Sequence, residues 1–361
     1  MPPSTVVVLA DDLTSAADGA APFRRSGHRA RVLFRPAPAV GDGVTAVDLG
    51  TRIVDETGAA ARTRRAAATY ADAELVLKTV DSTLRGHVAA ELRAALAGSG
   101  RRAAILAPAF PAEGRTTVAG VQYVRGVRVD ASEFARDPAH PVRTADLARV
   151  LPEAVLVEPE PAGLAGLPRL VEKGGVFVCS AVSDADLDAV VAALPRAEEV
   201  LWVGSPGLAD ALARAHSRNL AATLPELPPV HRPLAVVGSA NPASRRQLAA
   251  LRPVGAAVHT PEERAADPAE PLVRLTEEVR ERVRDGQADG LVLTGGETAA
   301  AVLGALGATG IELYDEPEPG IARGTLHGPG APRLPVLIKA GGFGDDGTLV
   351  RLTALLAGET P

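Results

Sequence analysis

The sequence of 361 residues has a single cysteine, Cys179, so an internal disulfide and a cysteine-based zinc site are both excluded. Its 38 basic residues are outnumbered by 44 acidic ones, and the net charge of −6 excludes the broad basic surface of a dedicated nucleic-acid-binding protein. No apolar stretch reaches the 18 residues that a membrane-spanning helix needs. These absences predict a cytoplasmic protein whose partners are neither nucleic acids nor membranes.

The length and composition predict two globular domains. Hydrophobic residues make up 46% of the chain and charged residues 23%, which is typical of folded proteins, and a domain takes roughly 150 residues. Four prolines fall within Leu224–Pro233, where they favour an extended, stiff connection. We therefore expect one domain over residues 1–224, a proline-rich linker over 225–233, and a second domain over 234–361.

Both domains are predicted to be α/β, each with a mostly parallel sheet flanked by helices. Short, continuous apolar runs alternate with alanine-rich helical stretches, which is the pattern of parallel strands buried on both faces. The expected strands are Thr5–Ala10, Leu75–Thr79, Ala104–Ala107, Val200–Val203, Leu234–Val237, Gly290–Thr294 and Leu334–Ile338. Ligands of such sheets gather beyond the carboxyl ends of the strands, so residues that follow the apolar runs are the candidate site residues.

Two adjacent aspartates, Asp11 and Asp12, follow the first expected strand. If a helix begins there, Asp11, Thr14 and Asp18 lie on one face, where they would bind Mg²⁺ through water or accept hydrogen bonds from a polyhydroxylated ligand. Helix capping is the alternative, because an aspartate at a helix start satisfies free N–H groups. Capping accounts for one aspartate better than for two.

The stretch from Lys78 to Gly86 is predicted to contact an anion. A helix is expected from His87 to Leu96, with Ser82 or Thr83 as its N-cap, which places the cation Arg85 at the positive end of the helix dipole. An anionic ligand at this place would offset the unfavourable charge. The alternative is a salt bridge from Arg85 to Asp81.

Three lysines stand among the 38 basic residues, and two of them, Lys78 and Lys339, lie near the carboxyl ends of expected strands. Because the chain otherwise uses arginine, these positions are candidates for a compact ammonium that arginine cannot replace, although chance retention also explains them. Gly114 and Arg115 follow another expected strand, where a shaped binding loop and a plain surface loop are equally good interpretations.

Three glycine-rich turns in the second domain predict a nucleotide phosphate site. They are Gly238-Ser239, Gly295-Gly296-Glu297-Thr298 and Gly341-Gly342-Phe343-Gly344. Glycines before a helix let backbone N–H groups approach a phosphate, whereas the simpler interpretation is a tight strand-to-helix turn. Ser239 is also a candidate N-cap for a helix that starts near Pro242.

Five blocks of the sequence together resemble the four-carbon acid sugar kinases. They are ADDLT (10–14), KTVDSTLRGH (78–87), APAFPAEGR (107–115), GGET (295–298) and KAGGFG (339–344), and the segment FARDPAHPV (134–142) is also similar to that family. The resemblance implies a sugar-acid domain followed by an ATP domain, with the active site in the cleft between them. It further implies that ATP phosphorylates the terminal hydroxyl (O4) of threonate, erythronate or 3-oxo-tetronate.

The resemblance also implies roles for individual residues. The sugar-acid site would comprise Asp11, Asp12, Lys78, Asp81, Ser82, Arg85, Gly114 and Arg115, and the ATP site would comprise Ser239, Gly295, Gly296, Glu297, Thr298, Lys339, Gly341 and Gly342. In phosphoryl transfer the arginines would bind the substrate carboxylate, and Asp12 or Asp81 would orient the O4 hydroxyl and take its proton. Lys339 and Mg²⁺ would hold the triphosphate. Which aspartate is the base, and which residues hold the metal, stays open.

A different class of function, a non-catalytic sensor of sugar acid and nucleotide, also fits two ligand sites joined by a linker. A phosphatase or an NAD-dependent dehydrogenase is disfavoured, because the DxDxT spacing and the complete dinucleotide-binding unit are both missing. A homodimer is the expected assembly.

Overall fold

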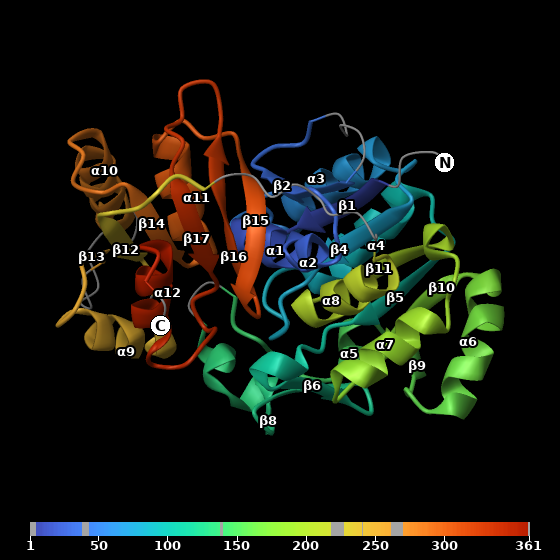
Figure 1. Ribbon diagram of the computed structural model, residues 1–361. Helices are drawn as coiled ribbons and strands as arrows, with labels where there is room; N and C mark the ends of the chain where they lie inside the picture. Colours follow the sequence, from blue (N-terminus) through green and yellow to red (C-terminus); the bar gives the residue numbers. More distant parts are fainter. Residues whose placement is uncertain are drawn as a thin grey trace. The chain divides into compact units, whose positions relative to one another are not determined.

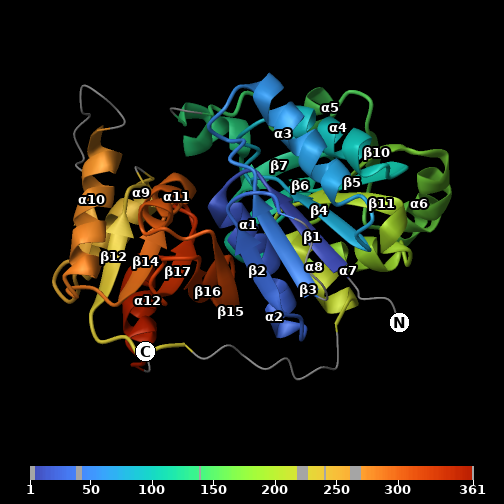
Figure 2. The same ribbon diagram turned by 90° about the horizontal axis from the view of Figure 1, so that it is seen from above.

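The computed structural model describes residues 5–37, 43–137, 140–217, 227–239, 241–260 and 270–359. They separate into two compact units, shown in Figures 1 and 2 and described here one at a time. The first is formed by Met1–Ala30 and Arg35–Ala222, and the second by Arg31–Phe34 and Thr223–Pro361. Of the predicted linker, 225 and 226 lie outside the described residues, and 227–232 form neither helix nor strand.

A parallel sheet forms the centre of the first unit. Its strand order is β3-β1-β4-β11-β5-β10-β9, and every neighbouring pair is parallel. The strands are β1 (Thr5–Ala10), β3 (Gly43–Asp48), β4 (Leu75–Thr79), β5 (Ala103–Ala107), β9 (Val155–Val157), β10 (Gly175–Cys179) and β11 (Val200–Gly204). Because β3, β1 and β4 are adjacent, the polar residues that follow them meet at one edge of the sheet.

Helices cover both faces of this sheet (Figure 2). One face packs against α3 (Glu56–Thr69) and α4 (Val88–Ser99), whose alanines and leucines join the buried valines of the sheet. The opposite side carries α1 (Leu13–Ala20), α2 (Pro22–Arg25), α7 (Asp184–Ala192) and α8 (Pro206–Ala215). Two further helices are α5 (Leu147–Val150) and α6 (Pro161–Lys173), and a small antiparallel sheet consists of β6 (Arg115–Val118), β7 (Val121–Val124) and β8 (Val127–Arg128).

The second unit has a mixed sheet. Four parallel strands in the order β13-β12-β14-β17 are followed by the antiparallel strands β16 and β15, and β2 (Ala30–Leu33) pairs with β15. The strands are β12 (Pro233–Val237), β13 (Ala257–His259), β14 (Gly290–Thr294), β15 (Gly310–Glu318), β16 (Ile321–His327) and β17 (Pro335–Lys339). The helices α9 (Pro242–Leu251) and α12 (Thr348–Leu356) cover one face, and α10 (Glu270–Arg284) and α11 (Gly296–Ala305) the other (Figure 1).

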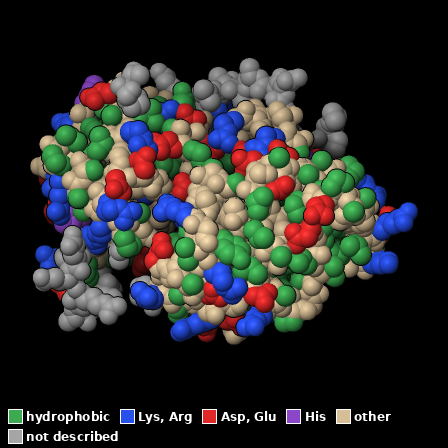
Figure 3. Space-filling view, turned by 90° about the horizontal axis from the view of Figure 1, so that it is seen from below, with side chains coloured by type: hydrophobic (Ala, Val, Ile, Leu, Met, Phe, Trp, Pro, Cys, Tyr) green, Lys and Arg blue, Asp and Glu red, His purple; other side chains and the backbone are tan. Residues whose placement is uncertain are grey.

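The α/β fold class is confirmed, since helices flank a parallel sheet in the first unit and a sheet with four parallel strands in the second. The second sheet is mixed rather than mostly parallel, because β16, β15 and β2 pair antiparallel. All seven expected strands exist, each within one residue of its predicted ends. The hairpin of β15 and β16 was not predicted, because β15 alternates apolar with charged residues and contains Pro317, which hides an apolar run. No helix of the described residues is long and apolar enough to cross a membrane. On the face seen in Figure 3, basic and acidic side chains are interspersed.

Candidate functional site

In the first unit, one arginine connects the carboxylates that follow β1 and β4. Arg52 donates from Nε and Nη2 to Asp11 Oδ2, at 2.9 and 2.7 Å, and from Nη1 to Asp12 Oδ2. Its Nη2 also lies 3.8 Å from Asp81 Oδ2. Arg52 was not predicted as a site residue, because the strand that precedes it, β3, was not recognised. The signal that would have found it is its place just beyond the carboxyl end of that strand.

The two adjacent aspartates have different roles. Asp12 is the N-cap of α1: its Oδ1 accepts from Ser15 N and from Thr14 Oγ1, both at 2.8 Å. Asp11 is 3% exposed, and its Oδ1 has no hydrogen-bond partner among the described residues. Burial alone would raise the pKa of Asp11, but the charges of Arg52 and Lys78 outweigh it and the pKa is lowered. Capping therefore explains Asp12 and leaves Asp11 as an ionised carboxylate with one unused oxygen.

Arg85 is paired with carboxylates, as the alternative to an anionic ligand predicted. It donates from Nε and Nη2 to Asp81 Oδ2, at 2.9 and 2.5 Å, and its Nη1 lies 3.3 Å from Asp137 Oδ2. Burial would raise the pKa of Asp81, but Arg85, Arg52 and hydrogen bonds from Thr83 keep that pKa well below its usual range. Asp81 therefore holds Arg85 in place and is a poor proton acceptor.

The expected N-cap of the following helix was wrong. The helix α4 begins at Val88, with His87 at the N-cap position and no side-chain cap, rather than at His87 with Ser82 or Thr83 as cap. Thr83 instead donates to Asp81 Oδ1 from its backbone N, at 2.6 Å, which folds the turn back on itself. Leu84, which follows in this turn, has a positive φ of 62°, and residues 85–87 separate it from the start of α4 at Val88.

Lys78 and Ser82 lie beneath this site. Lys78 is fully buried, and its Nζ lies 2.7 Å from Glu91 Oε2 and donates to Thr79 O at 2.6 Å. The backbone oxygen of Ser82 accepts from Gln122 Nε2 at 2.7 Å. Lys78 therefore joins β4 to α4 through a buried ion pair, and its charge also lowers the pKa of Asp11. Whether either residue binds substrate stays a prediction.

Arg115 is a buried cation. It is 2% exposed, and its guanidinium carbon lies 5.5 Å from the centre of the Phe134 ring, over which Arg85 also lies at 5.2 Å. No described residue hydrogen-bonds to the guanidinium or forms an ion pair with it, and burial lowers the pKa of Arg115. The plain surface loop is therefore excluded for Arg115. The preceding Gly114 has a φ of 66°, which permits the turn into β6.

A further carboxylate, Asp48, was also missed. It ends β3, it is aligned with the last residue of β1, and its Oδ1 accepts from Gly50 N at 2.8 Å. Burial is the main cause that raises the pKa of Asp48 to about 7; the charges of Asp12 and Asp11 act in the same direction, and the hydrogen bond from Gly50 acts against it. Asp48 therefore changes its charge near neutral pH, unlike Asp11 and Asp81.

In the second unit, the three predicted glycine turns follow the adjacent strands β12, β14 and β17 and come together. A Cβ atom on Gly341 would lie 2.3 Å from Ser239 Oγ, and one on Gly295 would lie 3.5 Å from Ser239 Cβ. A Cβ on Gly238 would lie 2.0 Å from Thr298 Oγ1. Side chains at these glycines would fill the space between the turns, which explains why three glycines stand there.

The starts of the helices after these turns differ from one another. The helix α11 has Gly295 as its N-cap and no side-chain cap, so the first-turn N–H groups of Gly296 and Glu297 are available to a ligand. The helix α9 is capped by Asn241, whose Oδ1 accepts from Ala243 N at 2.9 Å. Ser239 was therefore wrongly expected to cap α9, and its Oγ accepts from Asn241 N instead.

Lys339 is buried at the end of β17. Its Nζ donates to Ala340 O at 2.9 Å and to Phe343 O at 3.0 Å. The ammonium therefore lies against the backbone of the turn that follows β17. Its predicted contact with phosphate stays a prediction.

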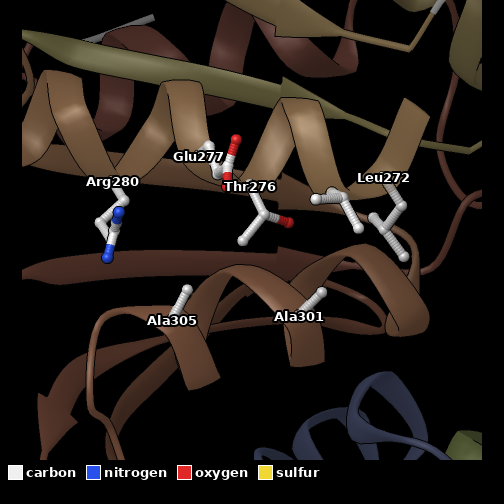
Figure 4. A pocket seen from close by; sticks show the side chains of 7 residues that line it. Leu272, Thr276, Glu277, Arg280, Ala301 and Ala305 are labelled. Atoms are coloured by element: carbon white, nitrogen blue, oxygen red, sulfur yellow. The ribbon is translucent and has the colours of Figure 1, made fainter. Parts of the chain in front are cut away.

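The structure also has a groove between α10 and α11, shown in Figure 4, with a volume of about 360 Å³. It is lined by Leu272, Val273, Thr276, Glu277, Arg280, Ala301 and Ala305. None of the residues predicted to bind nucleotide lines it. In the described ranges, no group of three or more His, Cys, Asp and Glu side chains is arranged to hold a metal ion. Because Mg²⁺ in phosphoryl-transfer sites takes most of its ligands from phosphates and water, this leaves the predicted Mg²⁺ untested.

Comparison with known proteins identifies the class. Residues 6–212 match the sugar-binding N-terminal domain family, and residues 260–349 match the nucleotide-binding C-terminal domain family. The chain is 36% identical to the D-threonate kinase of Bordetella bronchiseptica, with 95% of each chain covered. It is 30% identical to the D-threonate kinase of Salmonella typhimurium, covering 95% of this chain and 96% of that one.

The chain is also similar to a solved structure. That structure is a domain of unknown function from Bordetella bronchiseptica with bound citrate, described as a domain-swapped dimer. It is 31% identical, covers 99% of each chain, and has a TM-score of 0.55. The chain belongs to the four-carbon acid sugar kinase family. This confirms the resemblance and the predicted enzyme class, an ATP-dependent sugar-acid kinase.

Proposed function

We propose that the protein transfers the terminal phosphoryl group of ATP to the O4 hydroxyl of a four-carbon sugar acid, with D-threonate as the preferred substrate. The observation that carries the proposal is Arg115. Each of the neighbouring cations Arg52 and Arg85 is paired with aspartates, whereas the buried Arg115 has no carboxylate partner among the described residues. A buried charge without a partner is costly, and a substrate carboxylate would supply the partner in bidentate form.

The carboxylates would recognise the substrate hydroxyls. Both oxygens of Asp12 and of Asp81 already accept hydrogen bonds within the protein, whereas Asp11 Oδ1 accepts none from a described residue. These contacts favour Asp11 as the group that orients O4, with Asp12 and Asp81 holding the arginines. Phosphoryl transfer has little need of a strong base, so an ionised carboxylate that accepts a hydrogen bond from O4 is sufficient.

The turns of the second unit would hold the nucleotide. Ser239 and the amides at Gly296, Glu297 and Gly341 fit phosphate oxygens, because side chains are absent from the space between the turns. ATP supplies the transferred phosphoryl group, and Mg²⁺ would neutralise charge on its phosphates. That catalysis takes place in a cleft between a sugar-acid domain and a nucleotide domain stays part of the proposal. A homodimer is proposed as well, since the citrate-bound relative is described as a dimer.

A coupled assay of ADP release tests the proposal. Purified protein with Mg-ATP is offered D-threonate, L-threonate, D-erythronate, 3-oxo-tetronate and five-carbon analogues. We expect D-threonate to give the highest kcat/KM, with the phosphate on O4 by NMR. Tight binding of a sugar acid without any ADP release would support the sensor instead. Equal ADP release with all acids would contradict the preference for D-threonate.

A further inference from the structure

Two side chains of α9 reach the glycine turn that follows β17. Ser244 Oγ donates to Gly341 O at 2.7 Å, and Gln247 Nε2 donates to Phe343 O at 2.9 Å. Both side chains are fully buried. Neither residue lies in a motif that suggested a role, and neither follows a strand.

Lys339, the last residue of β17, is the third side chain that contacts the backbone oxygens of this turn. Its Nζ donates to Ala340 O and Phe343 O, and it lies 3.5 Å from Gly341 O. The carbonyls of Ala340, Gly341 and Phe343 are therefore all held by buried donors. Within the turn, Phe343 N also donates to Ala340 O at 3.2 Å. The side-chain donors add to this one backbone contact, which matters because glycine adopts many backbone conformations at similar energy.

The orientation of these carbonyls determines where the N–H groups point. No peptide bond of the described residues is cis, and in a trans peptide the C=O of one residue and the N–H of the next point to opposite sides. The N–H groups of Gly341 and Gly342 therefore point away from the buried donors. Neither N–H donates to a described residue. Successive N–H groups of this kind form an anion-binding concavity.

We propose that Ser244 and Gln247, together with Lys339, are positioning residues that orient the 340–343 turn so that its amides bind a phosphate group of the nucleotide. The inference rests on the proposed function and deepens it. Lys339 then contributes through the backbone of the turn, and its ammonium need not touch a phosphate. The chemistry on offer, two amides beside the Ser239 hydroxyl, suits the oxygens of a nucleoside diphosphate or triphosphate.

The affinity of single variants for ADP tests the inference without relying on activity. The variants are Ser244→Ala and Gln247→Met, which remove one donor each and keep the side-chain volume close to the original. Titration calorimetry measures the Kd for ADP and for D-threonate, and thermal unfolding without ligand reports the fold. The matched control is Arg246→Ala on the same helix, whose exposed side chain pairs only with Asp346 among the described residues.

We expect each variant to raise the Kd for ADP about 3- to 10-fold, as loss of one hydrogen bond predicts, and the double variant to raise it further. The Kd of these variants for D-threonate should stay within about twofold of wild type. The control variant should keep both its Kd for ADP and its Kd for D-threonate within the same range. Unchanged ADP affinity in a folded double variant would overturn the inference and leave the kinase proposal intact. Equal weakening of D-threonate would also overturn it, because the effect would then be general. Wild-type protein that binds no ADP would overturn both.

Discussion

The two units build their sites from different materials. The site of the first unit is made of charged side chains: Arg52 and Arg85 are held by Asp11, Asp12 and Asp81. The site of the second unit is made mainly of backbone, in three turns kept free of side chains by glycine. In the proposed function, the paired charges would fix atoms that recognise a specific pattern of hydroxyls and a carboxylate, whereas the backbone amides would donate hydrogen bonds to the phosphates of ATP. The difference would suit one site that selects its sugar acid and another that always binds the same phosphoryl donor.

The largest expected effect follows from removing the arginine that joins the three carboxylates. Arg52→Met leaves Asp11, Asp12 and Asp81 close together without their shared cation, and breaking a buried pair costs about 3–5 kcal/mol. Urea unfolding should show a loss of this size in the free energy of unfolding. We expect kcat to fall below about 1% of wild type, because carboxylates that Arg52 no longer holds would be misplaced relative to the substrate. The control Arg65→Met, exposed on α3, should change neither quantity. An unchanged free energy of unfolding in Arg52→Met would mean that repulsion among the three carboxylates does not destabilise the fold.

The next effect distinguishes the arginines of the first unit. Arg115→Met should lower kcat/KM for D-threonate roughly 10- to 150-fold, because a charge-assisted hydrogen bond contributes about 1.5–3 kcal/mol. The KM for ATP should not change. Arg128→Met, on the same small sheet but exposed, is the matched control. An equal rise in the KM for ATP would contradict the assignment of Arg115 to the sugar-acid site.

A smaller effect is expected where the second unit depends on glycine. Gly341→Ala puts a Cβ 2.3 Å from Ser239 Oγ, so the turn must shift and the KM for ATP should rise about 10-fold, equivalent to ~1.4 kcal/mol. Steady-state kinetics with saturating D-threonate measure it. Gly304→Ala in α11, where a Cβ meets nothing within 4 Å, should be harmless. The same KM for ATP in both variants would show that the close contact with Ser239 does not affect nucleotide binding.

The smallest expected effect concerns pH. In the folded protein the pKa of Asp48 is about 7, whereas an unfolded aspartate titrates near 3.9. The folded state therefore binds the extra proton between these values, and this group makes the free energy of unfolding fall as pH rises from about 4 to 7. Asp48→Asn removes that loss, so its Tm relative to wild type should rise by about 2 °C or more from pH 5 to pH 8. A constant difference across this range would contradict the raised pKa.

The sequence was sufficient for seven strands and for the places where they end, because continuous apolar runs mark buried parallel strands. It missed β3 and the β15–β16 hairpin among others. It located Asp11, Asp81 and Arg115 by the same reasoning. It did not reveal that Arg52 joins the aspartates, nor that Ser244 and Gln247 hold a turn almost a hundred residues away. Those partners depend on which strands and helices are neighbours in space, and the local sequence pattern of a single element does not show its neighbours.

The helix α1 has a consequence for motion at the site. All eight of its residues are buried, and a Cβ on Gly19 would lie 2.8 Å from Thr79 Cγ2, so the helix has no solvent face and little room to slide along the sheet. Asp12 caps this helix, and Asp11 precedes it. The amides of α1 should therefore be among the slowest in the protein to exchange with deuterium, opening only when the whole first unit unfolds. The carboxylates at its start are held by a rigid element, and any closure around the substrate must come from other segments.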